Sequence, residues 1–320
     1  MLSAREFRGV YAIIPTPSKA GAERLDAVDT VDLEETARSV EELLSAGISG
    51  LIALGTTGEC ATLSNADYDQ FVRCVLRTVK RRVPTFIGTS ALGGHEVARR
   101  TRQAQDLGAD GVLLGLPQWQ VCTQEMAVKF YAEVAELFPR LAIMVYANPR
   151  AFRFDFGDDF WREVSRKVPS ITSAKFNYPK RLLDVLKASD GRINFLPHEM
   201  GVQRYMELSP ETMTACWATA ASMGPEPVLA IMKAALAGNM TAVAAAHKDL
   251  AWAIEPVAAL IENPAEFASY NIQMEKIRID AAGYCKAGPI RPPYNVMPAQ
   301  WDEGSRECGR RWAQIRRKYT

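Results

Sequence analysis

Short apolar segments alternate with segments of helical periodicity along most of this chain. The apolar segments are continuous and end at glycine, proline or polar residues, as expected for parallel strands that are buried on both faces. They occupy residues 9–18, 50–55, 84–89, 111–116, 141–146, 171–175, 193–197 and 214–219. Apolar side chains recur at helical spacing between them, in residues 32–47, 64–79, 95–107, 124–138, 158–166, 180–188 and 200–208.

Eight strand–helix repeats within about 225 residues are typical of a (β/α)8 barrel, or TIM barrel, which is the fold class that we predict. A doubly wound open sheet shows the same alternation, but no G-x-G-x-x-G turn follows the first segment. After Gly224 the strand pattern stops, and alanine-rich helical patterns follow at residues 226–237, 241–261 and 265–281. Because no Ser/Gly/Pro-rich linker intervenes, we predict a barrel in residues 1–224 and a C-terminal helical extension in residues 225–320 that packs on it.

Composition and charge exclude several other classes of protein. Lys and Arg number 38 against 37 Asp and Glu, so no excess of positive charge favours nucleic acid or an anionic membrane as a partner. The first residues are charged where a signal peptide is apolar, and no run approaches the roughly 18 apolar residues of a membrane span. Six scattered cysteines without a C-x-x-C pair indicate free thiols rather than disulfides or a zinc site. We therefore expect a cytoplasmic protein without a bound metal.

Lys175 ends the sixth apolar segment, Ile-Thr-Ser-Ala-Lys. An ammonium is costly to bury, whereas a buried neutral amine is a good nucleophile that forms Schiff bases with carbonyl compounds. A strand-end lysine that points into water is the commoner interpretation of this segment alone. Barrel enzymes, however, carry their active sites at the C-terminal ends of the strands, and residues of catalytic type follow several strands here.

The turn after the second segment, Gly55-Thr-Thr-Gly58, offers backbone N–H groups and the hydroxyls of Thr56 and Thr57 to a carboxylate. The backbone conformation of a tight turn would explain its glycines equally well. Tyr146 ends the fifth segment, and its phenol can both donate and accept a proton, although such a tyrosine also suits the barrel mouth as an apolar plug.

Other residues near strand ends have weaker functional interpretations. Trp119 and Trp217 are candidates for the walls of an aromatic pocket, although tryptophans more often fill cores. A structural role bonded to backbone is the simpler interpretation of His198. Three arginines could each meet a second carboxylate but more commonly would be solvated: Arg150, Arg153 and Arg181.

Taken together, the Gly-Thr-Thr-Gly-Glu turn at residues 55–59, Tyr146 and Lys175 resemble the pattern of the dihydrodipicolinate synthase and N-acetylneuraminate lyase family of class I aldolases. The resemblance implies that Lys175 forms a Schiff base with pyruvate and that the two threonines of the turn hold the pyruvate carboxylate. It further implies that Tyr146 moves protons and that the protein is a homotetramer.

Two departures from the family pattern concern the partner of pyruvate. Synthases of the family usually have glutamate after the lysine, where this chain has Phe176, and a tyrosine pair after the fourth strand, where it has Gln118-Trp119. The relay tyrosine of a neighbouring subunit is therefore missing. Both changes replace polar by aromatic surface, which favours a flat apolar partner over an amino-aldehyde or a sugar.

Five further segments are similar to the hydratase-aldolases of bacterial polycyclic-aromatic degradation, namely residues 30–33, 58–63, 196–199, 270–272 and 280–295. This resemblance implies an aromatic 2-oxo acid as substrate, an ortho-substituted benzylidenepyruvate that water converts to an aromatic aldehyde and pyruvate. It supports Trp217 and Asn271 as substrate contacts, with Trp119 as a further candidate. Ala-Lys-Phe and the opening at residues 9–15 resemble the carboxy branch, so we predict trans-2'-carboxybenzalpyruvate as substrate and 2-carboxybenzaldehyde as product.

Several alternatives remain open from the sequence. The o-hydroxy substrate, which gives salicylaldehyde, is the nearest one, and a plain pyruvate-dependent synthase or lyase is disfavoured by Phe176 and Trp119. A non-catalytic sensor of 2-oxo acids would use the Gly-Thr-Thr-Gly turn alone. In the aldolase mechanism no metal or organic cofactor is required, because the iminium itself is the electron sink.

Overall fold

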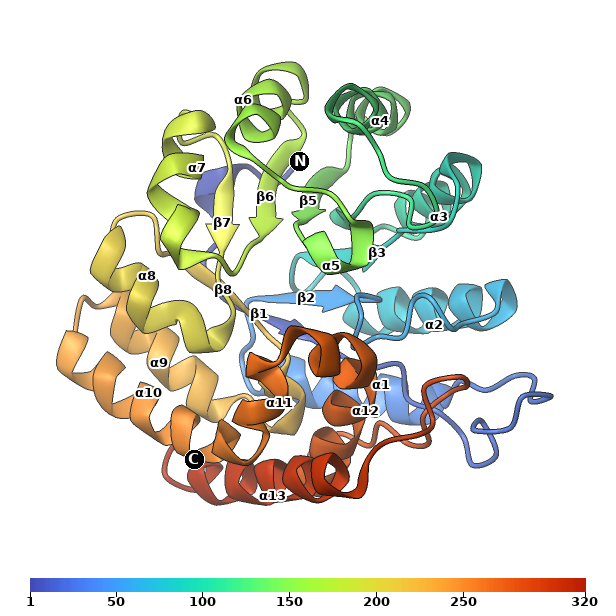
Figure 1. Ribbon diagram of the computed structural model, residues 1–320, viewed down its shortest axis with the longest axis vertical. Coiled ribbons are helices and arrows are strands. Elements are labelled where there is room, and N and C mark those ends of the chain that lie inside the picture. The colour runs from blue at the N-terminus through green and yellow to red at the C-terminus, as the bar shows by residue number, and fades with distance from the viewer.

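Eight parallel strands form the centre of the computed structural model, which describes residues 1–320 (Figure 1). The strands are β1 (Gly9–Ile13), β2 (Gly50–Ala53), β3 (Thr85–Gly88), β4 (Gly111–Leu114), β5 (Ala142–Tyr146), β6 (Ile171–Lys175), β7 (Asn194–Leu196) and β8 (Ala215–Ala218). Their hydrogen-bonded order is β7-β6-β5-β4-β3-β2-β1-β8. Between β7 and β8 a single parallel bridge joins His198 and Trp217, so the sheet closes almost completely. The predicted (β/α)8 TIM barrel is confirmed.

Helices surround the barrel in the order that the sequence predicts. The helices between strands are α1 (Leu33–Ser45), α2 (Asn65–Val79), α3 (Gly94–Asp106), α4 (Gln124–Leu137), α5 (Pro149–Phe152), α6 (Asp158–Lys167), α7 (Leu182–Ala188) and α8 (Val202–Leu208). The side chain of Asp32 caps α1 by accepting from the amide of Glu35, and Ser64 caps α2 in the same way. The four-residue helix α5 was not predicted, because one turn has no periodicity to detect.

Five helices form the C-terminal part, which lies along the lower side of the barrel in Figure 1. They are α9 (Glu226–Leu236), α10 (Met240–Ile254), α11 (Ala258–Glu262), α12 (Pro264–Ala282) and α13 (Ala299–Arg316). The predicted segment 241–261 is divided at a 3-10 turn containing Pro256, since proline cannot continue the hydrogen bonding of a helix interior. Helix α13 was not predicted, because its buried face is narrow within a sequence rich in arginine.

The C-terminal helices share a hydrophobic core with the barrel. The fully buried Trp312 of α13 packs in the main cluster, and its indole N–H donates to the carbonyl oxygen of Gly224 at 2.9 Å. Helix α12 is buried continuously from Ile272 to Ile279, a stretch that includes the charged Glu275, Lys276 and Arg278. The division of the chain at residue 224 stays a prediction.

Two further features concern the whole chain. All six cysteines are free thiols. None of the helices combines the length and the apolar character that crossing a lipid bilayer would need.

Candidate active site

Lys175 is the last residue of β6, and its side chain reaches across the mouth of the barrel. Its Nζ lies 4.6 Å from the centre of the Tyr146 ring and 3.9 Å from the centre of the Trp217 ring. Tyr146 and Lys175 are paired in register at the ends of β5 and β6, whereas Trp217 belongs to β8. The barrel therefore gathers at one point three side chains that are far apart in the sequence.

The residue after Lys175 points the opposite way, because successive side chains of a strand alternate between its two faces. Phe176 is buried and packs on Trp161, at a ring-centre distance of 6.0 Å, and on Phe195, at 5.2 Å. Phe176 therefore belongs to the hydrophobic core between the strands and the surrounding helices. The prediction that Phe176 adds aromatic surface beside the nucleophile is wrong.

Tyr146 is joined by hydrogen bonds to two polar side chains of the site. Its hydroxyl and that of Thr56 share a hydrogen bond of 2.6 Å, and the amide of Asn148 donates to the phenol at 3.4 Å. Burial alone raises the pKa of the Tyr146 phenol, but the positive charge of Lys175 and these two hydrogen bonds outweigh it, so the pKa is lowered. The phenol is thus suited to give up and take back a proton.

The turn that contains Thr56 and Thr57 has the form of an anion cradle. The backbone N–H groups of both threonines donate to no acceptor within the protein, and the side chain of Thr57 is buried. Gly58 is required, because a Cβ there would lie 2.7 Å from the backbone nitrogen of Leu54. Free N–H groups in a tight turn are what a carboxylate binds.

Trp217 packs against His198, which is paired with the buried Glu199. The rings of Trp217 and His198 lie 4.5 Å apart, and Nε2 of His198 is 2.8 Å from Oε2 of Glu199. Burial alone raises the pKa of the Glu199 carboxyl, but His198 outweighs it, so the pKa is lowered. His198 also accepts a hydrogen bond from the amide of Met200, in agreement with a structural role. The buried indole N–H of Trp217 has no partner.

The other two predicted substrate contacts, Trp119 and Asn271, form no hydrogen bond or ring contact with Lys175, Tyr146 or Trp217. Trp119 follows β4 and is 74% exposed, while Arg153 donates to its carbonyl oxygen. Asn271 lies half-buried on α12, and its side chain forms no hydrogen bond with the protein. The roles of Trp119 and Asn271 stay predictions.

Arg181 and Arg150 differ in whether the guanidinium is already paired with a carboxylate of the protein. Arg181 forms ion pairs with Asp155 and Asp158, at 2.9 and 3.4 Å. Arg150, at the start of α5, has no carboxylate partner, and its guanidinium lies 4.4 Å from the ring centre of Phe267 on α12. Arg150 is therefore a free cation where α5 and α12 meet.

A buried ion cluster behind the Thr-Thr turn was not predicted. Glu59 is paired with Lys276 at 2.8 Å and with Arg291, and all three side chains are almost inaccessible. Burial lowers the pKa of Lys276 to about 8. No local pattern marks Lys276, because it lies between Glu275 and Ile277 in a segment of mixed polar and apolar residues and resembles many solvated helix positions.

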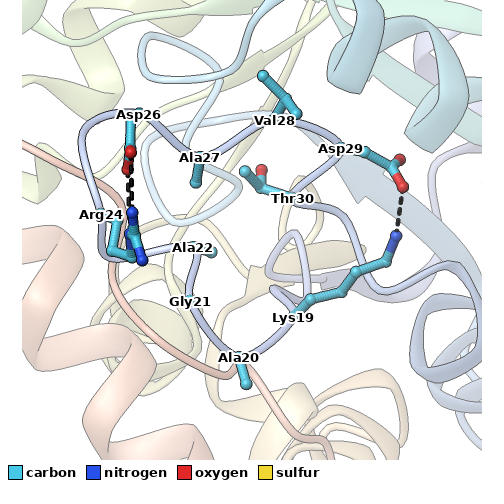
Figure 2. Close-up of a pocket in the computed structure, with 10 residues that line it drawn as sticks. All are labelled: Lys19, Ala20, Gly21, Ala22, Arg24, Asp26, Ala27, Val28, Asp29 and Thr30. Carbon is cyan, nitrogen blue, oxygen red and sulfur yellow. Dashed lines mark hydrogen bonds and ion pairs between the residues drawn. The ribbon is translucent and has the colours of Figure 1, made fainter.

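A pocket lies in the loop between β1 and α1, and its lining residue Thr30 accepts hydrogen bonds from Arg291 of the ion cluster. It is lined by residues 19–22, 24 and 26–30, with Arg24 hydrogen-bonded to Asp26 and Lys19 to Asp29 (Figure 2). Both ion pairs are solvated, and none of the predicted site residues lines this pocket.

Comparisons with known proteins were made by sequence and by structure. The model of the dihydrodipicolinate synthetase family matches residues 20–295. A trans-O-hydroxybenzylidenepyruvate hydratase-aldolase of Pseudomonas aeruginosa is 41% identical over 322 residues, which cover 100% of this chain and 96% of that protein. A trans-2'-carboxybenzalpyruvate hydratase-aldolase of Nocardioides sp. (strain KP7) is 37% identical over 329 residues, covering 100% of this chain and 97% of that protein.

Two solved structures show the same barrel. One, described as PhdJ bound to substrate intermediate, superposes with a TM-score of 0.96 at 34% identity and covers 100% of this chain and 99% of that one. The other is a 4-hydroxy-tetrahydrodipicolinate synthase from Methylacidiphilum fumariolicum SolV, with a TM-score of 0.82, 22% identity and 98% coverage of both chains. At that identity the second likeness concerns the fold alone.

Proposed function

We propose that this chain, which belongs to the dihydrodipicolinate synthetase family, is a Schiff-base hydratase-aldolase that converts an ortho-substituted benzylidenepyruvate and water to an aromatic aldehyde and pyruvate. One observation carries the proposal. The amine of Lys175 lies against Tyr146, whose hydroxyl is bonded to Thr56 in a turn with free N–H groups. Nucleophile, proton carrier and carboxylate site are thus adjacent, as a 2-oxo acid requires.

The reaction begins at the pyruvyl arm of the substrate. The turn at Thr56 and Thr57 binds the carboxylate and presents the neighbouring C2 ketone to Lys175. The amine adds to C2, and Tyr146 gives a proton to the departing oxygen, which leaves as water. The resulting iminium is conjugated with the C3=C4 double bond, so C4 becomes electrophilic.

Hydration and cleavage then use the same iminium as the electron sink. Water adds at C4, the electrons of the double bond move to form an enamine, and protonation at C3 restores the iminium. Tyr146, as phenolate, takes the proton of the new C4 hydroxyl while the C3–C4 bond breaks and its electrons return to the nitrogen. The aldehyde leaves, the pyruvate enamine is protonated at C3, and water releases pyruvate and free Lys175. Asn271 is proposed to position the water or the hydroxyl.

The aryl group of the substrate is proposed to lie against Trp217, with Trp119 as a second wall. Support for Trp217 is its position beside the Lys175 amine, since a group attached to the iminium must pass close to that ring. The unpartnered indole N–H of Trp217 offers in addition a donor for an oxygen of the bound substrate.

The ortho substituent distinguishes two candidate substrates. Identity is 41% to the relative named for the hydroxy compound and 37% to the one named for the carboxy compound, a difference too small to choose between them. One structural observation favours the carboxy compound, trans-2'-carboxybenzalpyruvate. Arg150 is a cation without a carboxylate partner near the end of β5, and it suits a second carboxylate.

The proposal includes a cytoplasmic homotetramer. Free thiols, as all six cysteines have, suit a reducing compartment. Large apolar side chains are exposed after β3 and β4, at Leu92, Trp119 and Val121, and a partner subunit would bury them. Light scattering on the purified protein tests the assembly, and a mass of one chain, 35.4 kDa, would contradict it.

The central test is reductive trapping followed by turnover. Borohydride added with pyruvate is expected to leave a covalent adduct on Lys175, identified by mass spectrometry of the peptide. Ortho-carboxy and ortho-hydroxy benzylidenepyruvates are then supplied, and loss of their conjugated absorbance is followed. Turnover of aspartate semialdehyde alone would favour a plain synthase, and binding of pyruvate without an adduct would favour a sensor.

A further inference from the structure

Glu59, which directly follows the Thr-Thr turn, forms a buried cluster with two cations. Oε2 of Glu59 accepts from Nζ of Lys276 at 2.8 Å and from Nη1 of Arg291. Lys276 also donates to the hydroxyl of Ser18 at 2.9 Å and to the carbonyl oxygen of Pro289 at 2.8 Å. All donors of the ammonium are therefore used, and the cluster is fully satisfied although it is buried.

The cluster is connected to the turn by two chains of hydrogen bonds. The amide of Glu59 donates to the carbonyl oxygen of Thr56 at 2.9 Å, which closes the turn. Arg291 donates to the carbonyl oxygen of Thr16 at 3.1 Å. The Thr16 hydroxyl in turn donates to the carbonyl oxygen of Gly58 at 2.7 Å. The turn is thus fixed at Thr56 by the backbone of Glu59 and at Gly58 by Thr16, which Arg291 holds in turn.

The backbone at both sides of the turn adopts an unfavourable conformation that surrounding contacts must stabilise. Glu59 has φ of 54°, and Leu54 before the turn has φ of 61°, both in the left-handed region that non-glycine residues avoid. Strained conformations persist where surrounding contacts determine them. The buried carboxylate of Glu59 makes those contacts, so its ion pairs hold the residue in a conformation that it would otherwise leave.

The three charged side chains of the cluster do not cancel one another. Within the cluster two cations, Lys276 and Arg291, pair with the single carboxylate of Glu59, and the further carboxylate Asp280 acts on Lys276 less strongly than Glu59 does. Charges in a buried region are weakly screened. An anion bound by the turn would therefore interact favourably with this cluster without touching it.

From these contacts we infer that Lys276, together with Arg291 and Glu59, is a positioning residue that sets the selectivity of the Thr-Thr turn for a substrate carboxylate. The inference rests on the proposed function, because it assigns the turn to the carboxylate of the 2-oxo acid. The C-terminal part of the chain thereby enters the site: Lys276 comes from α12 and Arg291 from the segment after it.

The test compares two ketones that differ only in the carboxylate charge. Pyruvate and its neutral methyl ester are each trapped with borohydride, and the ratio of their rates of adduct formation at Lys175 is measured. Lys276→Met and Lys276→Gln are expected to lower the preference for pyruvate by about tenfold, since a buried charge near the turn is lost. The ratio is unaffected by any fraction of unfolded protein, because both rates come from one sample.

A matched control lies on the same helix. Arg278 is equally buried and is paired with Glu275 at 2.7 Å, but it does not contact the turn, so Arg278→Met is expected to keep the wild-type ratio. A wild-type ratio in both Lys276 variants, or an equal fall in the Arg278 variant, overturns the inference. Absence of any wild-type adduct with pyruvate would instead overturn the proposed function, so the two failures are distinguishable.

Discussion

The side-chain nitrogen Nζ of Lys175 lies 3.9 Å from the centre of the Trp217 ring. The face of an indole attracts a cation, and the attraction strengthens where water is excluded. The attacking amine is neutral, whereas the iminium formed at Lys175 carries a positive charge at nearly the same place, so the ring would stabilise the covalent intermediate more than the free amine. Trp217 therefore has two roles in the proposed mechanism, as a wall for the aryl group and as a neighbour of the charge.

Replacing Trp217 tests this contact. Trp217→Leu is expected to slow adduct formation with pyruvate about tenfold, which corresponds to the 1–2 kcal/mol of a desolvated cation–π contact. Trp217→Phe keeps an aromatic face and is expected to lose less. Rates of borohydride trapping measure the effect, and equal rates for the leucine and phenylalanine variants would show that the ring face is unimportant.

Removing the Lys175 amine should abolish turnover. Lys175→Met is expected to lower kcat/KM for benzylidenepyruvates at least about a thousandfold, a rise of about 4 kcal/mol in the activation barrier. It should also form no adduct with pyruvate. Lys180→Met removes an exposed lysine five positions away and serves as the control that retains activity. Comparable turnover in the two variants would refute the Schiff-base mechanism.

Tyr146 is expected to act through its proton. Tyr146→Phe keeps the ring but removes the hydroxyl, so kcat should fall by about a hundredfold or more, as is typical of a general acid–base residue. Tyr319→Phe is the control, because Tyr319 lies next to the last residue of the chain and its hydroxyl donates to Asp249. Steady-state rates measure both variants, and a similar small loss in each would remove Tyr146 from the mechanism.

The lowered pKa of Tyr146 also predicts a pH dependence. The folded protein should release this proton at a lower pH than the unfolded chain, whose tyrosine titrates near its ordinary value of 10.0. Its contribution to stability is therefore present above that value and is lost as the pH falls through the lowered folded pKa. Phenolate absorbance is titrated against pH in the wild type and in Tyr146→Phe, and the difference between the two curves reports Tyr146. A midpoint of that difference above pH 10.0 would contradict the lowered pKa.

Arg150 is expected to distinguish the two ortho substituents. Arg150→Gln should raise KM for the o-carboxy substrate by about tenfold or more, as for a lost charge-assisted hydrogen bond, and should leave the o-hydroxy substrate nearly unchanged. Arg181→Gln is the matched control, because Arg181 is already paired with Asp155 and Asp158. An equal effect of Arg150→Gln on both substrates would exclude a contact with the ortho carboxylate.

Much of the architecture was predictable, because a parallel strand buried on both faces and an amphipathic helix each leave a local pattern. Helices α5 and α13 were missed for the opposite reason: the first is a single turn, and the second has few apolar residues in a sequence rich in arginine. The prediction for Phe176 is wrong because adjacent residues of a strand face opposite ways, so Phe176 points away from the site that Lys175 enters.

The sequence by itself determined that Lys175, Tyr146 and the Thr-Thr turn follow strands of one barrel, and strand ends of one barrel meet at one mouth. Only the tertiary structure decided what surrounds them. The ring of Trp217 beneath the amine and the ion pairs of Glu59 with Lys276 and Arg291 join residues that lie 42, 217 and 232 positions apart. Contacts at such separations depend on how helices pack on the barrel, and no local pattern in the chain records them.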